Sequence, residues 1–139
     1  MLKKFSVSNY RKYNGTLEFD LTAGNYIFNP DCIHQDLVKL ALIYGENGTG
    51  KSNLGWAIFD LVSHLTDNES NISKNNYLNA LSREKYATFK FEFIFSGKYK
   101  KNKKIVYEYQ KNENSTLISE KISIGNELIL NYQLNQPLF

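Results

Sequence analysis

Residues 45–52 read Gly-Glu-Asn-Gly-Thr-Gly-Lys-Ser, which completes the pattern G-x-x-x-x-G-K-[ST]. The apolar run Leu-Ala-Leu-Ile-Tyr at residues 40–44 precedes this segment, and a stretch with helical periodicity follows it. A strand, a glycine-rich loop and a helix in this order are the structural context in which the pattern holds phosphate groups. The sequence therefore predicts a phosphate-binding loop that takes ATP or GTP.

The residue types of this loop suit a nucleotide and its metal ion. Gly45, Gly48 and Gly50 let the backbone approach a phosphate without a Cβ in the way. The N–H groups of the loop and of the helix N-terminus can then converge on the anion. Lys51 can reach the β- and γ-phosphates, and the Ser52 hydroxyl suits Mg²⁺. The predicted cofactors are thus ATP and Mg²⁺, and the predicted binding residues are Gly45, Glu46, Asn47, Gly48, Thr49, Gly50, Lys51, Ser52 and Asn53, with Ser52 as the metal ligand.

The pattern of apolar residues predicts a helix over residues 52–65. One stripe is expected to be buried, and Trp56 and Phe59 lie off this stripe, so the helix is expected to be covered on more than one side. The stripe consists of Leu54, Ala57, Ile58, Leu61, Val62 and Leu65.

Period-two alternation predicts strands on both sides of this loop and helix. Two strands joined by a turn are expected within residues 2–21, and residues 37–44 read as a further strand. Phenylalanines at 89, 91, 93 and 95 predict a strand with one inward face, and further strands are expected at 105–110, 116–124 and 127–130. Because the turns after residue 86 are short, this last group is expected to form antiparallel hairpins.

Length and composition narrow the functional classes. The chain has 139 residues, of which 42% are hydrophobic, enough for one domain with a core. No apolar run reaches the ~18 residues of a membrane span, and no secretory signal is evident at the start. Cys32 is the single cysteine, which excludes an internal disulfide and favours a cytoplasmic setting without a membrane. Five lysines in residues 98–104 form either a solvated hairpin tip or, with Tyr99 stacking on a base, a nucleic-acid contact.

Two segments together carry a resemblance to a known family. Residues 4–13, Lys-Phe-Ser-Val-Ser-Asn-Tyr-Arg-Lys-Tyr, are similar to a strand that ends in an Asn-aromatic-Arg turn, and residues 45–53 are similar to the phosphate loop of the same proteins. Over most of its length the chain resembles the N-terminal lobe of ABC-type ATPase heads of the SMC, RecF and RecN kind. In particular it resembles bacterial AAA-ATPases related to the overcoming-lysogenization-defect proteins and to abortive-infection ATPases.

This resemblance implies a fold and further site residues. The implied fold is α/β with α+β character: a P-loop NTPase with a mixed sheet around the phosphate-loop helix and an additional antiparallel β group. It implies that Asn9, Arg11 and Lys12 contact adenine or phosphates, although Arg11 and Lys12 read equally well as solvated turn residues. Asn53 is expected to support the loop or cap the helix. Tyr26 is either an adenine-stacking aromatic or a core residue.

The departures from the family pattern concern hydrolysis. No apolar strand ending in Asp or Glu follows the loop, and Asp60 belongs to the loop's own helix. A signature segment and a switch histidine are also missing, because His34 and His64 stand in other contexts. Gln133 and Gln136 are candidates for a γ-phosphate sensor. We therefore expect residues 1–139 to be a single partial domain, the N-terminal lobe of a larger ATPase, and the chain alone to be inactive in hydrolysis.

Three functions remain open at this point. The first is the ATP-binding lobe of an SMC/RecF-like ATPase in DNA repair or anti-phage defence. The complete protein would then be a homodimer or oligomer, with a nuclease or effector partner and possible DNA contact. The second is the nucleotide-binding subunit of an ABC transporter, which Asn53 and the turn at residues 9–11 disfavour. The third is a non-catalytic nucleotide-binding or assembly module.

Overall fold

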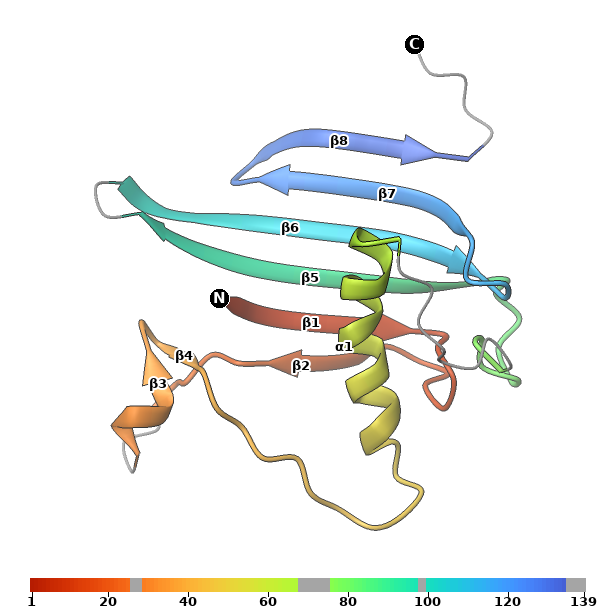
Figure 1. Cartoon of the computed structure of the whole chain (residues 1–139), viewed down its shortest axis with the longest axis horizontal. Helices are drawn as coiled ribbons and strands as arrows, with labels where there is room; N and C mark the ends of the chain where they lie inside the picture. Colours follow the sequence, from red (N-terminus) through yellow and green to blue (C-terminus); the bar gives the residue numbers. More distant parts are fainter. Residues whose placement is uncertain (26–28, 68–75, 98–99, 135–139) are drawn as a thin grey trace.

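The chain forms one six-stranded antiparallel sheet with a single long helix on one face (Figure 1). This computed structural model describes residues 1–25, 29–67, 76–97 and 100–134. In space the strands follow the order β2-β1-β5-β6-β7-β8. Their bounds are β1 Leu2–Ser8, β2 Leu17–Asp20, β5 Tyr86–Gly97, β6 Lys100–Asn112, β7 Leu117–Ile124 and β8 Glu127–Gln133.

The alternating pattern of β5 explains the core. Phe89 and Phe91 are fully buried, and their rings stack against Tyr109 of β6 at centroid distances of 5.0 and 6.2 Å. Phe5 of β1 lies 4.7 Å from Phe91, so three neighbouring strands share one aromatic face. Farther along the strand Phe95 is 54% exposed. The predicted antiparallel group after residue 86 is confirmed by the pairing of β5 with β6, β6 with β7 and β7 with β8.

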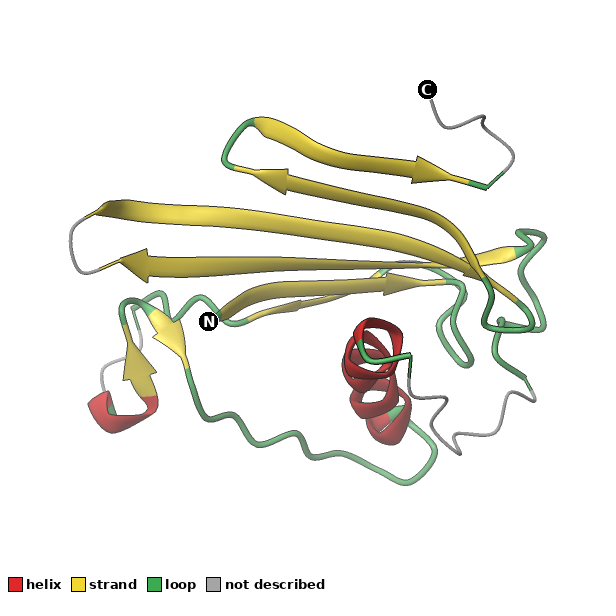
Figure 2. Cartoon of the chain, turned by 45° about the horizontal axis from the view of Figure 1, so that its top comes forward, coloured by secondary structure: helices red, strands yellow, loops and turns green. Residues whose placement is uncertain are grey.

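Helix α1 (Lys51–Leu65) crosses this aromatic face, as Figure 2 shows from a second direction. Leu54 and Ala57 are buried against the sheet, which confirms the expected helix and part of its stripe. The outward side of the helix is exposed, however, at Phe59, Val62 and Leu65. The expectation that the helix is covered on more than one side is therefore wrong, because within the described residues the six-stranded sheet covers only one side of it.

The predicted fold class is also wrong. A mixed α/β sheet around the phosphate-loop helix requires parallel neighbours, and parallel neighbours require crossover connections. Every strand pair in the described residues is antiparallel, and α1 lies on one face of the sheet rather than within it. Few residues separate the consecutive strands β5, β6, β7 and β8 in sequence, so each pairs antiparallel with the next, and β5 also pairs antiparallel with the distant strand β1.

The segment before the phosphate loop also differs from the predicted fold. A short helix (Pro30–Cys32) and the two-stranded sheet of β3 (Ile33–His34) and β4 (Leu37–Val38) lie beside the main sheet. Residues 40–44, which read as a strand, run as an exposed segment that pairs with no strand among the described residues, with Leu42 90% exposed. Strand propensity alone did not produce a strand here, because strand formation also depends on a neighbouring strand to pair with.

Candidate phosphate-binding site

The predicted phosphate loop leads directly into α1. Gly48 and Gly50 adopt φ values of 82° and 103°, in the left-handed region that favours glycine. Gly50 is the N-cap of α1, and no side chain caps the helix there. The first turn of α1 also contains no acidic residue. Among the described residues, no side chain therefore caps the N–H groups of this first turn. The first turn also carries no carboxylate that would repel an incoming anion.

Lys51 lies over the loop that it follows. Its Nζ donates hydrogen bonds to the carbonyl oxygens of Gly45 and Glu46, at 2.7 and 2.6 Å. Thr49 Oγ1 donates to the Glu46 carbonyl as well, at 2.9 Å. The loop thus closes around the ammonium group through its own backbone. Residues 45–49 are exposed, so an anion in solution can reach this positive charge.

A turn far away in sequence holds the loop from a second side. Lys12 Nζ donates to the carbonyl oxygen of Gly48, and the Tyr13 hydroxyl donates to that of Gly50 at 2.8 Å. A Cβ on Gly50 would lie 3.2 Å from the Tyr13 hydroxyl oxygen, so any larger residue would press against this ring. The structure thus brings Lys12 to the loop and adds Tyr13, which sequence reasoning had not selected.

The structure gives Asn9 a task in the scaffold. Asn9 is 1% exposed, and its amide nitrogen donates to the carbonyl oxygens of Glu84 and Tyr86 at 2.9 and 2.7 Å. Its Oδ1 accepts a hydrogen bond from the Asn79 N–H at 3.3 Å. The side chain is therefore committed to protein backbone and does not reach the phosphate loop.

Arg11 extends the turn toward the helix. Its guanidinium carbon lies 4.6 Å from the centre of the Trp56 ring, and its Nε donates to the Tyr10 hydroxyl at 3.1 Å. Cation–π contact of this kind stabilises by about 0.5–1 kcal/mol at exposed sites. Residues 9–13 are thus attached to the second turn of α1 as well as to the phosphate loop.

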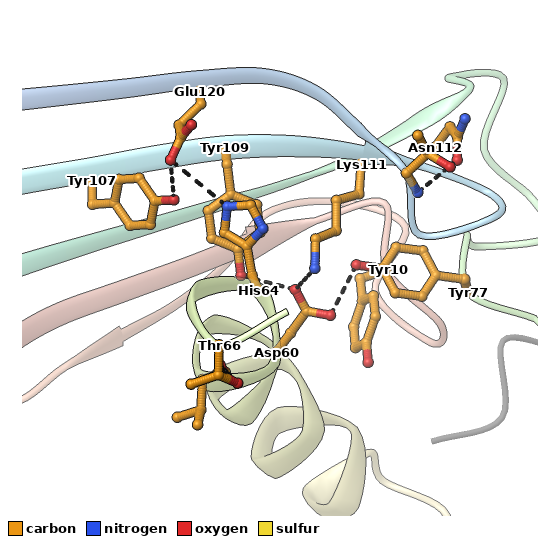
Figure 3. A network of polar contacts seen from close by, with 12 residues as sticks. Tyr10, Asp60, His64, Thr66, Tyr77, Tyr107, Tyr109, Lys111, Asn112 and Glu120 are labelled. Carbon is orange, nitrogen blue, oxygen red and sulfur yellow. Dashed lines mark hydrogen bonds and ion pairs between the residues drawn. The ribbon is translucent and has the colours of Figure 1, made fainter. Parts of the chain in front are cut away.

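A buried polar network joins α1 to the sheet, as Figure 3 shows. Asp60 of α1 accepts hydrogen bonds from the hydroxyls of Tyr77 and Tyr109, at 3.1 and 2.9 Å, and from Lys111 Nζ at 2.7 Å. Burial, together with the Asp60 charge, raises the pKa of both tyrosines, so both remain protonated donors at neutral pH. Asp60 and Lys111 form a buried ion pair that has further hydrogen-bond donors around it.

His64, one turn after Asp60, completes this side of the helix. Its ring stacks on Tyr109 at 4.4 Å, and its Nε2 lies 3.8 Å from a Glu120 carboxylate oxygen. The same carboxylate accepts a hydrogen bond from the Tyr107 hydroxyl. Burial and the positive charge of Lys111 lower the pKa of His64, although Glu120 acts in the opposite direction. The ring is therefore neutral at pH 7.

The remaining candidates lie at varied places. Ser52, Asn47 and Glu46 are exposed in or beside the loop, and Asn53 is half-buried in the first turn of α1. Gln133 ends β8, and His34 lies in β3. Tyr26, Tyr99 and Gln136 lie outside the described residues. Within residues 1–25, 29–67, 76–97 and 100–134, no three His, Cys, Asp or Glu side chains gather as a metal site.

Sequence reasoning had set Asp60 aside, although one signal was present. Asp60 lies beside the apolar stripe of the helix, three residues after Ala57 and directly before Leu61, where an unpaired carboxylate would be costly to bury. A charge at such a position indicates buried partners. The sequence did not reveal that these partners would be Tyr77, Tyr109 and Lys111.

Comparison of the sequence with protein-family models and with curated proteins gives no match. In the described part of the chain no helix combines the length and the apolar character needed to cross a membrane.

Proposed function

We propose that this chain binds the phosphate chain of ATP, together with Mg²⁺, through residues 45–52. The observation that supports this most directly is the arrangement of Lys51 beside a glycine loop at the uncapped N-terminus of α1. Anions favour such a helix end because unpaired N–H groups and the helix dipole point toward them.

The residues of the site fit a nucleotide. Gly48 and Gly50 hold backbone conformations that exclude most side chains, and the space beside Gly50 would not accept a Cβ without displacing Tyr13. Lys51 and Lys12 each donate to loop carbonyl oxygens, so both ammonium groups lie beside the loop. Lys51 would supply charge to the phosphates, and Ser52, exposed in the first helical turn, would hold Mg²⁺. The bound metal ion would neutralise phosphate charge.

We further propose that the chain acts as the ATP-binding part of an SMC/RecF-like ATPase, in DNA repair or anti-phage defence. The turn at residues 9–13 supports this, because it resembles the Asn-aromatic-Arg turn of those proteins and contacts the loop here through Lys12 and Tyr13. The sequence holds no strand ending in a carboxylate after the loop, so the chain by itself is expected not to hydrolyse ATP. Steady phosphate release by the purified chain that Lys51→Ala abolishes would contradict this expectation.

The length of the phosphate chain provides the test of phosphate recognition. Displacement of a fluorescent ATP analogue would be measured with ATP, ADP and AMP in the presence of Mg²⁺. Because Lys51 is proposed to reach the β- and γ-phosphates, ATP and ADP should displace the analogue, and AMP should do so far less well. Lys39→Ala, which removes another exposed lysine, serves as the control and should leave this ranking unchanged. Equal displacement by AMP and ATP would overturn the proposal.

Self-association provides a second test. In paired ATPase heads the nucleotide lies between two subunits, each of which supplies a different segment. Because the sequence lacks a signature segment, ATP alone is expected not to dimerise the chain in sedimentation experiments. Dimerisation driven by ATP and lost in Lys51→Ala would instead show that this chain supplies both halves of the contact.

A further inference from the structure

Asp60, which accepts hydrogen bonds from three residues of the buried network, lies on α1, the helix that directly follows the phosphate loop. Asp60 stands nine residues after Lys51 and faces the sheet, where it is buried with Lys111. Its two carboxylate oxygens have different partners: Oδ1 accepts from Tyr77, whereas Oδ2 accepts from Tyr109 and Lys111. The Oδ2 side thus connects α1 to β6, and the Oδ1 side connects it to the segment that contains Tyr77.

Tyr77 in turn fixes the turn at residues 9–13. Its carbonyl oxygen accepts a hydrogen bond from the Arg11 N–H at 3.0 Å. Its ring packs edge-on against Tyr10 at 5.1 Å. Asn79, two residues later, donates to the Arg11 carbonyl oxygen at 2.6 Å and so extends the same attachment.

The turn then reaches the phosphate loop, through Lys12 to Gly48 and through Tyr13 to Gly50. These contacts form a continuous path that runs from Asp60 through Tyr77 and the turn to the loop. The loop is therefore held from two directions, by its covalent continuation into α1 and by the turn. Asp60 is attached to both, because it belongs to α1 and binds the residue that anchors the turn.

We propose that Asp60 is a positioning residue of the phosphate site: through Tyr77 it fixes the turn at residues 9–13 relative to α1, and so holds the phosphate loop in its binding shape. This inference rests on the proposed nucleotide binding. It assigns Tyr77 a role that Tyr109 does not share, although both hydroxyls bind the same carboxylate. A loop that is already held in its bound shape binds more tightly, because less ordering remains to be done on binding.

Three tyrosine-to-phenylalanine variants separate positioning from stability. Tyr77→Phe removes the hydrogen bond that leads to the turn, and Tyr109→Phe removes one to the same carboxylate that leads only to β6. Tyr107→Phe removes a hydroxyl bound to Glu120 and serves as a control outside the Asp60 contacts. Mg-ATP affinity and urea unfolding would be measured on the full 139-residue chain for all three variants and the wild type.

Tyr77→Phe should weaken Mg-ATP binding about three- to tenfold, the factor expected from losing one hydrogen bond. Tyr109→Phe and Tyr107→Phe should bind within about twofold of the wild type even where they unfold as easily as Tyr77→Phe. Equal weakening in all three variants would show a general loss of structure and overturn the inference. Unchanged binding in Tyr77→Phe would overturn it as well.

Two further measurements complete the test. Trp56, the single tryptophan, stacks on Arg11, so Tyr77→Phe should increase quenching of its fluorescence by acrylamide without nucleotide, and Tyr109→Phe should not.

The double variant Asp60→Leu with Lys111→Met replaces the ion pair by apolar side chains, which a folded core often tolerates. It should stay folded and bind Mg-ATP at least as weakly as Tyr77→Phe; wild-type affinity in this folded variant would contradict the inference. Failure of the wild type to bind Mg-ATP would overturn the proposed function and this inference together, whereas wild-type binding with unaltered Tyr77→Phe overturns the inference alone.

Discussion

The sheet side of α1 and its N-terminal loop differ in what their contacts accomplish. On the sheet side, Leu54 and Ala57 are buried among aromatic rings, and Asp60 is paired with Lys111. At the N-terminal end, residues 45–49 are exposed, and Lys51 bonds the carbonyl oxygens of its own loop. The first region stabilises the fold through burial, whereas the second offers charge and N–H groups to a ligand. Substitutions in the first should therefore alter unfolding, with an effect on binding only where they break the path from Asp60 through Tyr77 to the loop. Substitutions in the loop should alter binding.

The largest effect is expected in the aromatic core. Phe89→Ala removes a fully buried ring that stacks on Tyr109, and it should lower the free energy of unfolding by about 3–5 kcal/mol. Phe95→Ala, on the same strand but 54% exposed, is the matched control and should cost far less. Urea unfolding followed by circular dichroism measures both, and equal losses would contradict the account of the core.

Breaking the buried ion pair on one side should have a comparable effect. Lys111→Met leaves the Asp60 carboxylate buried with only tyrosine hydroxyls as donors, and should destabilise the chain by about 3–5 kcal/mol. The free energy of unfolding at neutral pH would show this. Adding Asp60→Leu should recover part of the loss, because the unpaired charge is then gone, although the hydroxyls of Tyr77 and Tyr109 lose their acceptor. A double variant no more stable than Lys111→Met would show that the unpaired Asp60 charge is not the cause of the lost stability.

A smaller effect is expected where the turn meets the loop. Tyr13→Phe keeps the ring but removes the hydrogen bond to the Gly50 carbonyl, which should cost about 0.5–1.5 kcal/mol. Unlike Phe89→Ala, it should also weaken Mg-ATP binding, because this hydroxyl holds the loop itself. Urea unfolding and Mg-ATP titration of the same variant test the two effects. Unaltered binding would show that the Tyr13 hydroxyl does not contribute to the phosphate site.

The pH dependence should come from the sheet side. Burial lowers the pKa of His64 from its ordinary value of 6.5, so on acidification the unfolded chain takes up a proton more readily than the folded chain. The free energy of unfolding should therefore fall as the pH drops from about 6.5 toward the lower pKa of the folded state. His64→Gln should flatten this part of the profile, measured by thermal unfolding between pH 7.5 and 5. An unchanged slope would assign the effect to other groups.

The smallest effect is expected before the loop. Leu42→Ser alters a side chain that is 90% exposed, so the free energy of unfolding should change by less than about 0.5 kcal/mol. A large loss would show that residues 40–44 pack against the protein in solution.

Residues 40–44 and β5 also show how far the sequence could predict this fold. Both segments are apolar and strand-like, but the strand predicted from the alternation at Phe89 and Phe91 has a partner on each side, β1 and β6, and that prediction is confirmed. Residues 40–44 have no such neighbour in the described chain, and the mixed sheet expected around the phosphate-loop helix is wrong. Strand propensity is a local property, whereas pairing depends on what the rest of the chain provides.

The candidate site divides in the same way. The phosphate loop is a continuous motif whose residues could be named from the sequence, and its binding role stays a prediction. Tyr13 and Asp60 act through contacts with residues far away in sequence, at Gly50 and at Tyr77, Tyr109 and Lys111. Such contacts leave no local pattern, apart from the charge of Asp60 beside an apolar stripe. Asn9, expected at the nucleotide, is instead committed to the scaffold.

The most direct test of the central claim compares the wild type with Lys51→Ala in two measurements. Calorimetric titration with Mg-ATP should show binding to the wild type, and the variant should bind more weakly by about 1–3 kcal/mol, because it loses a charge-assisted contact to the phosphates. Urea unfolding of the two chains should agree within about 0.5 kcal/mol, since Lys51 bonds only exposed loop carbonyls in the described structure. Absence of Mg-ATP binding by the wild type, or equal binding by Lys51→Ala, would contradict the assignment of residues 45–52 as a phosphate site.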